Sequence, residues 1–325
     1  MDALSDALQH IRLQGAWFLN GEFREPWCVD IPPPEQLAAL FLPGAERLAV
    51  CHVVVRGQCW ARLPGQEPMP LHEGQVVVFP HGDAHLLGSG LRHAPVSLDH
   101  VIVPRVPELH RVSYGGSGAA TLVMCGWFAY ERHIPNPLVA ALPRQWMASL
   151  EQQPCQAWLL PAIQYALADA AAGRPGAEAA AARIAEILFV ELLRCHVAAL
   201  PAEHAGWLAG VRDPLVGRCL GLLHERPAHT WTVAELAQAL AVSRSVLAER
   251  FSALVGQPPM HYLKHWRLVL AARQLRQQGA ALARVAASVG YASPAAFNRA
   301  FKEAFGVSPG QWRDTTAAEA EAAAP

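Results

Sequence analysis

The C-terminal third of the chain repeats itself at an interval of 50 residues. The matched residues are Ser243 and Ser293, Phe251 and Phe301, Gly256 and Gly306, and Pro259 and Pro309, with Leu247 opposite Phe297. Two copies of one unit within about 100 residues strongly restrict the fold, because both copies must form the same helices and pack them in the same way.

The first copy reads as two short helices joined by a tight turn. Thr232 and Glu235 have the spacing of a capping box, which predicts a helix over residues 233–240. Ala241 and Val242 then form the connection, and Ser243 is a suitable N-cap for a second helix. In that second helix Leu247, Phe251 and Leu254 fall on one face. This pattern is typical of a helix-turn-helix unit, whose second helix enters the major groove of DNA.

The second copy carries the same signals. Gly290 suits a turn with positive φ, Ser293 is an N-cap, and Pro294 fits the first helical position. The inward face of its second helix is predicted from three phenylalanines, Phe297, Phe301 and Phe305. Between the copies, residues 261–277 predict one helix, with Lys264, Arg267, Arg273 and Arg276, that would hold the two readers about 34 Å apart, one turn of DNA.

Charge supports DNA as the partner of this region. Residues 213–314 hold twelve Lys and Arg against six Asp and Glu, whereas residues 1–212 hold fourteen against nineteen. A basic excess confined to one block is what a surface that meets phosphate requires. Two helical hairpins in an ordinary all-α domain are the alternative interpretation, and the tandem repeat, the capping box and the basic block together disfavour it.

Both copies resemble the AraC/XylS family of transcription regulators. The resemblance covers about residues 213–314, and its most specific part runs from Val285 through Gly290 and Phe297 to Trp312. It implies a seven-helix DNA-binding domain and control of transcription by a dimer. The residues expected to meet DNA are Arg244, Ser245, Glu249, Ala295, Asn298 and Arg299, with Lys302 also pointing outward.

The first reading helix departs from that family. It has Ala248 and Glu249 where other members often carry Gln or Arg. An acid at this place either accepts a hydrogen bond from a cytosine amino group or repels phosphate. We therefore expect the first half to read DNA more weakly than the second.

The N-terminal region reads as β structure over residues 15–128, with short apolar runs between turn clusters. The spacing from Gly74 through Pro80 and Gly82 to His85, with residues 52–57 before it, resembles the cupin barrel, which precedes some AraC-family DNA-binding domains as a sensor. The first cupin motif is broken, because His52 is followed by two valines and no glutamate comes soon after. Two histidines alone do not make the 2-His-1-carboxylate site of an oxygenase.

Three interpretations of the barrel stay open. His52 and His85, completed by Cys125 or Asp83, are candidates for an effector or metal site, although a turn histidine bonded to backbone is the simpler interpretation of His85. A thiol sensor would use Cys51, Cys59 or Cys125, which sit in predicted strands where cysteine is usually an inert small hydrophobe. A metal-dependent cupin enzyme with a structural helical domain is the alternative function.

The segment after the barrel predicts helices near residues 138–150, 155–172 and 177–199, and these are the candidates for dimerisation. The last of them is rich in alanine and leucine. No apolar run reaches the length needed to span a bilayer, and residues 1–14 lack the apolar core of a secretory signal. The seven cysteines show no metal-binding spacing, which favours reduced thiols in a cytoplasm.

These inferences predict an α+β chain of four parts. They are a cupin-like sensing domain over 1–130, a helical connector over 131–210, a tandem helix-turn-helix domain over 211–314 and a disordered tail over 315–325. The predicted function is sequence-specific binding of double-stranded DNA by a cytoplasmic homodimer, a transcription activator rather than an enzyme. We expect no cofactor and no membrane partner; RNA polymerase and an unidentified effector, a small molecule or a redox signal, are the further candidate partners.

Overall fold

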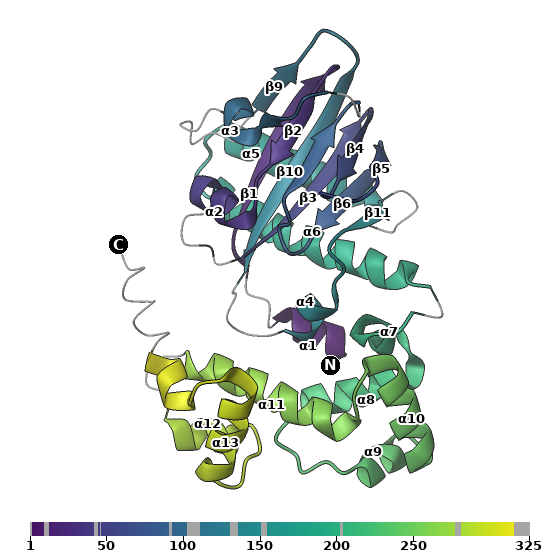
Figure 1. Cartoon of the computed structure of the whole chain (residues 1–325), viewed down its shortest axis with the longest axis vertical. Helices are drawn as coiled ribbons and strands as arrows, with labels where there is room; N and C mark the ends of the chain where they lie inside the picture. The colour runs from purple at the N-terminus through teal and green to yellow at the C-terminus, as the bar shows by residue number, and fades with distance from the viewer. Residues whose placement is uncertain are drawn as a thin grey trace. The chain divides into compact units, whose positions relative to one another are not determined.

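The structure, a computed structural model, describes residues 2–9, 13–41, 45, 47–90, 93–102, 111–130, 136–150, 155–201, 204–276 and 281–314. The chain forms two compact units (Figure 1). The barrel unit comprises Arg12–Arg132 and Leu142–Ala199, and the helical unit comprises Met1–Ile11, His133–Ala141 and Leu200–Pro325. The predicted tail, residues 315–325, lies outside the described residues.

Two sheets form the barrel unit. The six-stranded sheet has the spatial order β11 (Trp146–Ser149), β6 (Gln75–Phe79), β3 (Arg47–Arg56), β10 (Ala120–Tyr130), β1 (Leu13–Arg24) and β9 (Arg111–Gly115). The five-stranded sheet has the order β5 (Met69–His72), β4 (Gln58–Arg62), β7 (His85–Gly88), β2 (Cys28–Ile31) and β8 (Val96–Ser97). Pairing is antiparallel except between β1 and β9 and between β2 and β8. Two short helices, α2 (Pro34–Phe41) and α3 (Leu98–Val101), interrupt this part of the chain.

The two sheets enclose one apolar core, because alternate residues of each strand face inward. In β10 the inward set is Val123, Cys125, Trp127 and Ala129. These side chains form one cluster with Val29 and Leu87 of the other sheet and with Trp27, which directly precedes β2. The predicted cupin-like β-barrel therefore agrees with the structure.

Helices cover the outer face of the six-stranded sheet. α6 (Ala177–Ala199) contacts β1 and β11 and pairs with α5 (Gln156–Ala171). Phe189 of α6 lies 5.8 Å from Phe128 of β10, measured between ring centroids, and Phe128 is not part of the inner core. No helix in the described ranges combines the length and apolar character that a bilayer-spanning helix needs.

One predicted helix was wrong in part. The segment expected to be helical near 138–150 forms only the short α4 (Pro137–Ala141), and after Pro143 the chain becomes strand β11. Trp146 and Ala148 are buried while Met147 is exposed, which is the two-residue alternation of a strand. β11 pairs with the edge of β6, a partner about 70 residues earlier in the chain.

The helical unit holds the remaining helices. They are α1 (Ala3–Gln9), α4, α7 (Trp207–Arg212), α8 (Pro214–Glu225), α9 (Val233–Ala239), α10 (Arg244–Val255), α11 (Pro259–Leu275), α12 (Leu282–Ser288) and α13 (Pro294–Phe305). Within this unit, α8, α9 and α10 gather at one end of α11, and α12 and α13 gather at the other (Figure 1). The long helix predicted over 261–277 thus connects the two copies of the repeat.

A buried polar network joins the N-terminal helix α1 to this unit. Asp6 of α1 lies 2.7 Å from Nδ1 of His224 in α8, measured from its Oδ2 atom. His224 Nε2 lies 2.6 Å from the hydroxyl of Tyr262 in α11, which accepts a hydrogen bond of 2.8 Å from the indole of Trp207. The imidazole also stacks on Trp266 at 4.2 Å. Although α1 precedes the barrel in the sequence, it is therefore anchored on α8 and α11.

Candidate nucleic-acid interface and the buried histidines of the barrel

The first helix-turn-helix forms as its capping signals predict. The hydroxyl of Thr232 accepts from the backbone of Glu235 while the Glu235 carboxylate accepts from the backbone of Thr232, so the capping box is complete. Ser243 caps α10 by accepting from the backbone N–H of Val246 at 3.2 Å. Leu247 and Phe251 are fully buried, which seats α10 on the rest of the unit.

The second helix-turn-helix uses equivalent devices. Ser293 caps α13 by accepting from the backbone of Ala296 at 3.2 Å, and Pro294 occupies the first turn. Gly290 has φ of +84°, the left-handed conformation expected of it. Phe297 and Phe301 are buried, and Phe305 packs against their cluster together with Trp312.

The structure also shows that the repeat changes register at its turn. The first helices, α9 and α12, are related by a shift of 49 residues, and the second helices, α10 and α13, by a shift of 50. The extra residue lies in the second turn, where Gly290 takes the place of Ala241; both have positive φ, and Ala241 has φ of +58°. The 50-residue interval therefore describes the reading helices, and the turns before them differ in length by one residue.

All seven residues predicted to meet DNA are exposed. Four belong to α13 and three to α10, and the full set is Arg244, Ser245, Glu249, Ala295, Asn298, Arg299 and Lys302. The structure thus places them on the solvent side of the two reading helices, opposite the buried phenylalanines. No described residue forms an ion pair with Arg244, Arg299 or Lys302, so these three cations are available to a phosphate or a base edge.

Other cations of the helical unit already have partners within the protein. Arg250 of α10 donates to Asp213 at 2.9 and 2.6 Å, and Lys264 of α11 lies 2.9 Å from Glu303 of α13. Arg267 donates to the carbonyls of Pro227 and His229, which holds the loop between α8 and α9. Sequence patterns did not show these pairings, because each joins residues about 40 positions apart.

The barrel brings its three candidate residues into one buried chain of hydrogen bonds. His52 Nδ1 lies 2.8 Å from the Cys125 sulfur, His52 Nε2 lies 2.7 Å from His85 Nε2, and His85 Nδ1 lies 2.7 Å from the carbonyl oxygen of Asp83. The Asp83 carboxylate is not part of this chain of hydrogen bonds. It accepts two hydrogen bonds from Arg144 instead. His52 and His85 are 0% and 1% exposed, so bulk solvent does not reach these bonds.

The direction of each bond follows from the carbonyl at the end of the chain. A carbonyl only accepts, so His85 carries its proton on Nδ1 and accepts on Nε2. His52 then donates from Nε2 and accepts the thiol proton of Cys125 on Nδ1. Burial is the main reason that the pKa of His85 falls to about 4 and that of His52 falls well below its ordinary value. All three groups are therefore neutral near pH 7 and have a partner for every proton in the chain.

This arrangement differs from a metal site. In the described parts of the chain, no three His, Cys, Asp or Glu side chains are grouped so that they could hold one metal ion. His52 turns one ring nitrogen to Cys125 and the other to His85, so the sulfur and the second imidazole lie on opposite sides of its ring. Phe79 stacks on His85 at 3.7 Å and closes that side.

The thiols of the barrel are equally enclosed. Cys51, Cys59 and Cys125 lie in β3, β4 and β10 as predicted, and all three are buried. Burial raises the pKa of Cys51 and of Cys59 to about 12, and raises that of Cys125 well above its ordinary value. Because the thiolate is the reactive form, this setting makes the three sulfurs poor nucleophiles.

The neutral histidine pair makes the stability of the barrel fall in acid. Unfolded histidine titrates near pH 6.5, whereas in the folded barrel the pKa of His85 is about 4 and that of His52 lies well below its ordinary value. The unfolded chain therefore binds more protons as the pH falls below 6.5. We expect each histidine to remove up to about 1.4 kcal/mol of unfolding free energy per pH unit below 6.5. Hydrogen exchange of β3 and β10 amides at pH 7.5, 6.5 and 5.5 measures this slope.

The double variant H52Q/H85Q is the control for that slope. It keeps polar side chains but cannot titrate, so its stability should depend on pH less steeply than that of the wild type. Equal slopes for the two proteins would show that the histidines are not held neutral.

Comparison with known proteins agrees with both units. The family described as Cupin matches residues 2–198, and the family described as Helix-turn-helix domain matches residues 236–315. An AraC-like transcription regulator of Streptomyces antibioticus is 38% identical over 96% of this chain and 98% of its own length. An AraC-like transcription regulator of Streptomyces lividans is 38% identical over 83% of this chain and 88% of its own length.

A more distant relative is the RCS-specific HTH-type transcriptional activator RclR of Escherichia coli strain K12. It is 27% identical over 97% of this chain and 98% of its own length. The match to the Streptomyces antibioticus regulator covers 96% of this chain, so the similarity is not confined to the DNA-binding part. The chain belongs to the AraC family of transcription regulators, with a cupin domain ahead of its helix-turn-helix domain.

Proposed function

We propose that this regulator binds double-stranded DNA with α10 and α13 as its two reading helices. The observation that carries the proposal is the pair of Ser-capped helices, seated at the two ends of α11, whose solvent-facing residues are the predicted contact set. Arg244, Arg299 and Lys302 supply cations for phosphate or guanine, and Asn298 supplies an amide that can pair with adenine.

The two readers are proposed to contribute unequally. α13 presents Asn298, Arg299 and Lys302, whereas α10 presents Arg244, Ser245 and the acidic Glu249. Arg250 adds no free charge to α10, because Asp213 already neutralises it. The second reader therefore carries more of the affinity, and the first contributes mainly through Arg244 and Ser245.

Replacing Arg299 with alanine tests the proposal. We expect the variant to bind operator DNA, selected by the wild type from a random duplex pool, about 1–3 kcal/mol more weakly, since it loses a base or phosphate contact. Fluorescence anisotropy measures the affinity. Arg56→Ala, which removes the same charge from an exposed position in β3, is the matched control and should bind normally. Equal binding by the Arg299 variant would exclude α13 as a reader.

We propose that the barrel senses a signal and that the regulator acts in the cytoplasm. A small-molecule effector is the first candidate, because the buried cysteines of the barrel, with their raised pKa values, are unsuited to a reactive thiol. A redox signal is the second candidate, because the strands of the barrel carry the thiols of Cys51, Cys59 and Cys125. Mass spectrometry after mild oxidant separates the two: no modified cysteine while DNA binding persists would exclude a thiol sensor.

We also propose that the regulator is a homodimer that contacts RNA polymerase as an activator. Trp158 and Tyr165 of α5 and Ile187 of α6 are large apolar side chains that remain 44–55% exposed in the barrel unit. Such side chains on a neighbouring helix pair suit an interface between copies. If light scattering finds a monomer both with and without DNA, the homodimer proposal is contradicted.

A further inference from the structure

Asp213 lies outside both helix-turn-helix units, yet its carboxylate serves two structures at once. Its Oδ1 atom accepts from the backbone N–H groups of Leu215 and Val216, at 3.0 and 2.9 Å, and so caps α8. Its Oδ2 atom accepts two hydrogen bonds from Arg250 of the first reading helix, from Nε at 2.9 Å and from the terminal nitrogen at 2.6 Å. The Asp213 side chain is only 9% exposed.

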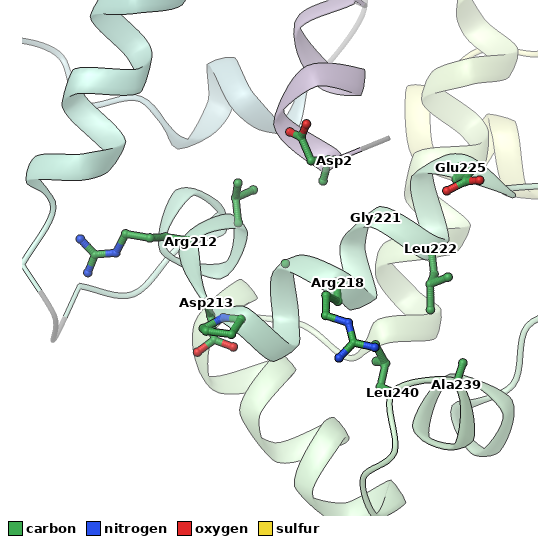
Figure 2. A pocket seen from close by; sticks show the side chains of 13 residues that line it. Asp2, Arg212, Asp213, Arg218, Gly221, Leu222, Glu225, Ala239 and Leu240 are labelled. Atoms are coloured by element: carbon green, nitrogen blue, oxygen red, sulfur yellow. The ribbon is translucent and has the colours of Figure 1, made fainter. Parts of the chain in front are cut away.

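The charge on Asp213 is secured by these contacts. Burial alone would raise its pKa, but the hydrogen bonds from Arg250 and from the start of α8 outweigh burial and lower it. Asp213 is the N-cap of α8 and lines a pocket of about 480 Å³ together with Arg218 and Leu240 (Figure 2). The Asp213 carboxylate thus binds both the N-terminus of α8 and the first reading helix, α10.

The contacts that hold α10 in place explain why Asp213 matters for this helix. Leu247 and Phe251 anchor one face of the helix in the core. The C-terminal half is tied by two further bonds, the Arg250 pair and a backbone bond of 2.7 Å from Gly206 to the carbonyl of Leu254. Arg244 and Ser245, in the first turn of α10, are exposed, so their direction depends on how the rest of the helix is held.

The second reader is seated differently. The residue that corresponds to Arg250 in α13 is Ala300, which is 7% exposed and packs in an apolar cluster with α11 and α12. α13 is therefore fixed by apolar packing, with Phe297 and Phe301 on the same side. α13 also has a charged pair outside its own helix-turn-helix, Lys264 with Glu303, but these side chains are 45% and 69% exposed, and exposed pairs contribute little. The pair that holds α10 differs because the Asp213 side chain is nearly buried.

We propose that Asp213 is a positioning residue for DNA recognition, which acts through Arg250 to aim the first reading helix. The inference rests on the proposed function and adds a residue that contacts no DNA. It distinguishes two roles for Arg250. If Asp213 aims α10, loss of its charge weakens DNA binding; if Arg250 instead contacts phosphate and Asp213 merely competes for it, the same loss strengthens binding.

The test uses the full chain and the selected operator, together with two operators in which one half-site or the other is scrambled. Asp213→Asn retains an oxygen that can cap α8 but presents no negative charge to Arg250. We expect Asp213→Asn and Arg250→Met each to weaken operator binding about tenfold, and the double variant to lose no more than either alone. Both should lose discrimination against the operator whose α10 half-site is scrambled, and both should keep it for the α13 half-site.

Three further readouts make the outcome decisive. The salt dependence of binding should stay the same in Arg250→Met, because a residue that contacts phosphate would lower that slope by about one. Arg250→Lys keeps a cation near Asp213 and should recover part of the affinity. Thermal unfolding should show that Asp213→Asn remains folded.

Tighter or unchanged binding by Asp213→Asn would overturn the proposal. So would additive effects of the two substitutions, because independent residues do not share one mechanism. Failure of the wild type to select any sequence from the pool would instead contradict the proposed function, and is thereby distinguished from failure of this inference.

Discussion

Asp6→Ala is expected to destabilise the helical unit by about 2–4 kcal/mol, although residue 6 lies more than 200 positions from the helices it stabilises. The carboxylate is 10% exposed and faces Nδ1 of His224, whose side chain is fully buried. Without it, a buried N–H loses its acceptor, and a buried donor left without a partner carries the whole cost of its lost hydration. Hydrogen exchange of the α8 and α11 amides in the full chain measures the loss.

Asp6→Asn is the matched control, because its amide oxygen still accepts from His224 while the charge is removed. We expect it to retain most of the stability that Asp6→Ala loses. The double variant Asp6→Ala with His224→Ala should lose less than the two single changes together, since the second substitution removes the donor left unpaired. Normal protection of α8 and α11 in Asp6→Ala would contradict the docking of α1.

Features set by near neighbours were predictable from the sequence. The capping box of Thr232, the caps of Ser243 and Ser293 and the turn at Gly290 each depend on residues within one or two helical turns, so a local pattern specifies them. The same holds for the buried phenylalanines of α13, whose spacing matches the helical period. The seven predicted contact residues are all exposed for the same reason.

Features that depend on distant partners were not predictable in this way. The segment Trp146–Ser149 became a strand because the edge of β6 offered it hydrogen bonds, and nothing in its own composition announces that partner. The contact between Asp6 and His224 joins residues that are 218 positions apart in the sequence, so no local pattern predicts it. The barrel histidines were named from a motif, but the contact of His52 with Cys125 follows from the pairing of β3 with β10, which puts the two residues opposite each other. His85 meets the other ring nitrogen of His52 from β7, a strand of the other sheet. Sequence thus identified which residues meet, and the sheet register decided how.

Gly290→Ala is expected to destabilise the second helix-turn-helix by about 2–4 kcal/mol, through two costs that add. The first is conformational, because φ of +84° costs an L residue about 1–2 kcal/mol. The second is steric, because a Cβ at this position would lie 2.7 Å from the carbonyl oxygen of Ala228 and 2.9 Å from its Cα. Both neighbours belong to the backbone, so no side-chain rotation relieves them. Hydrogen exchange of the α12 and α13 amides in the full chain reports the loss.

The first turn supplies the reverse experiment in the same molecule. Ala241 occupies the equivalent position with φ of +58°, so it already bears the conformational cost that Gly290 avoids. Ala241→Gly should therefore stabilise the first helix-turn-helix, by about 0.5–1 kcal/mol, because relief of the left-handed backbone exceeds the entropy that glycine loses on folding. Opposite signs at the two turns would show that both adopt the same left-handed geometry. A loss of stability in Ala241→Gly would mean that the first turn does not bear that cost and that the two copies differ in backbone as well as in length.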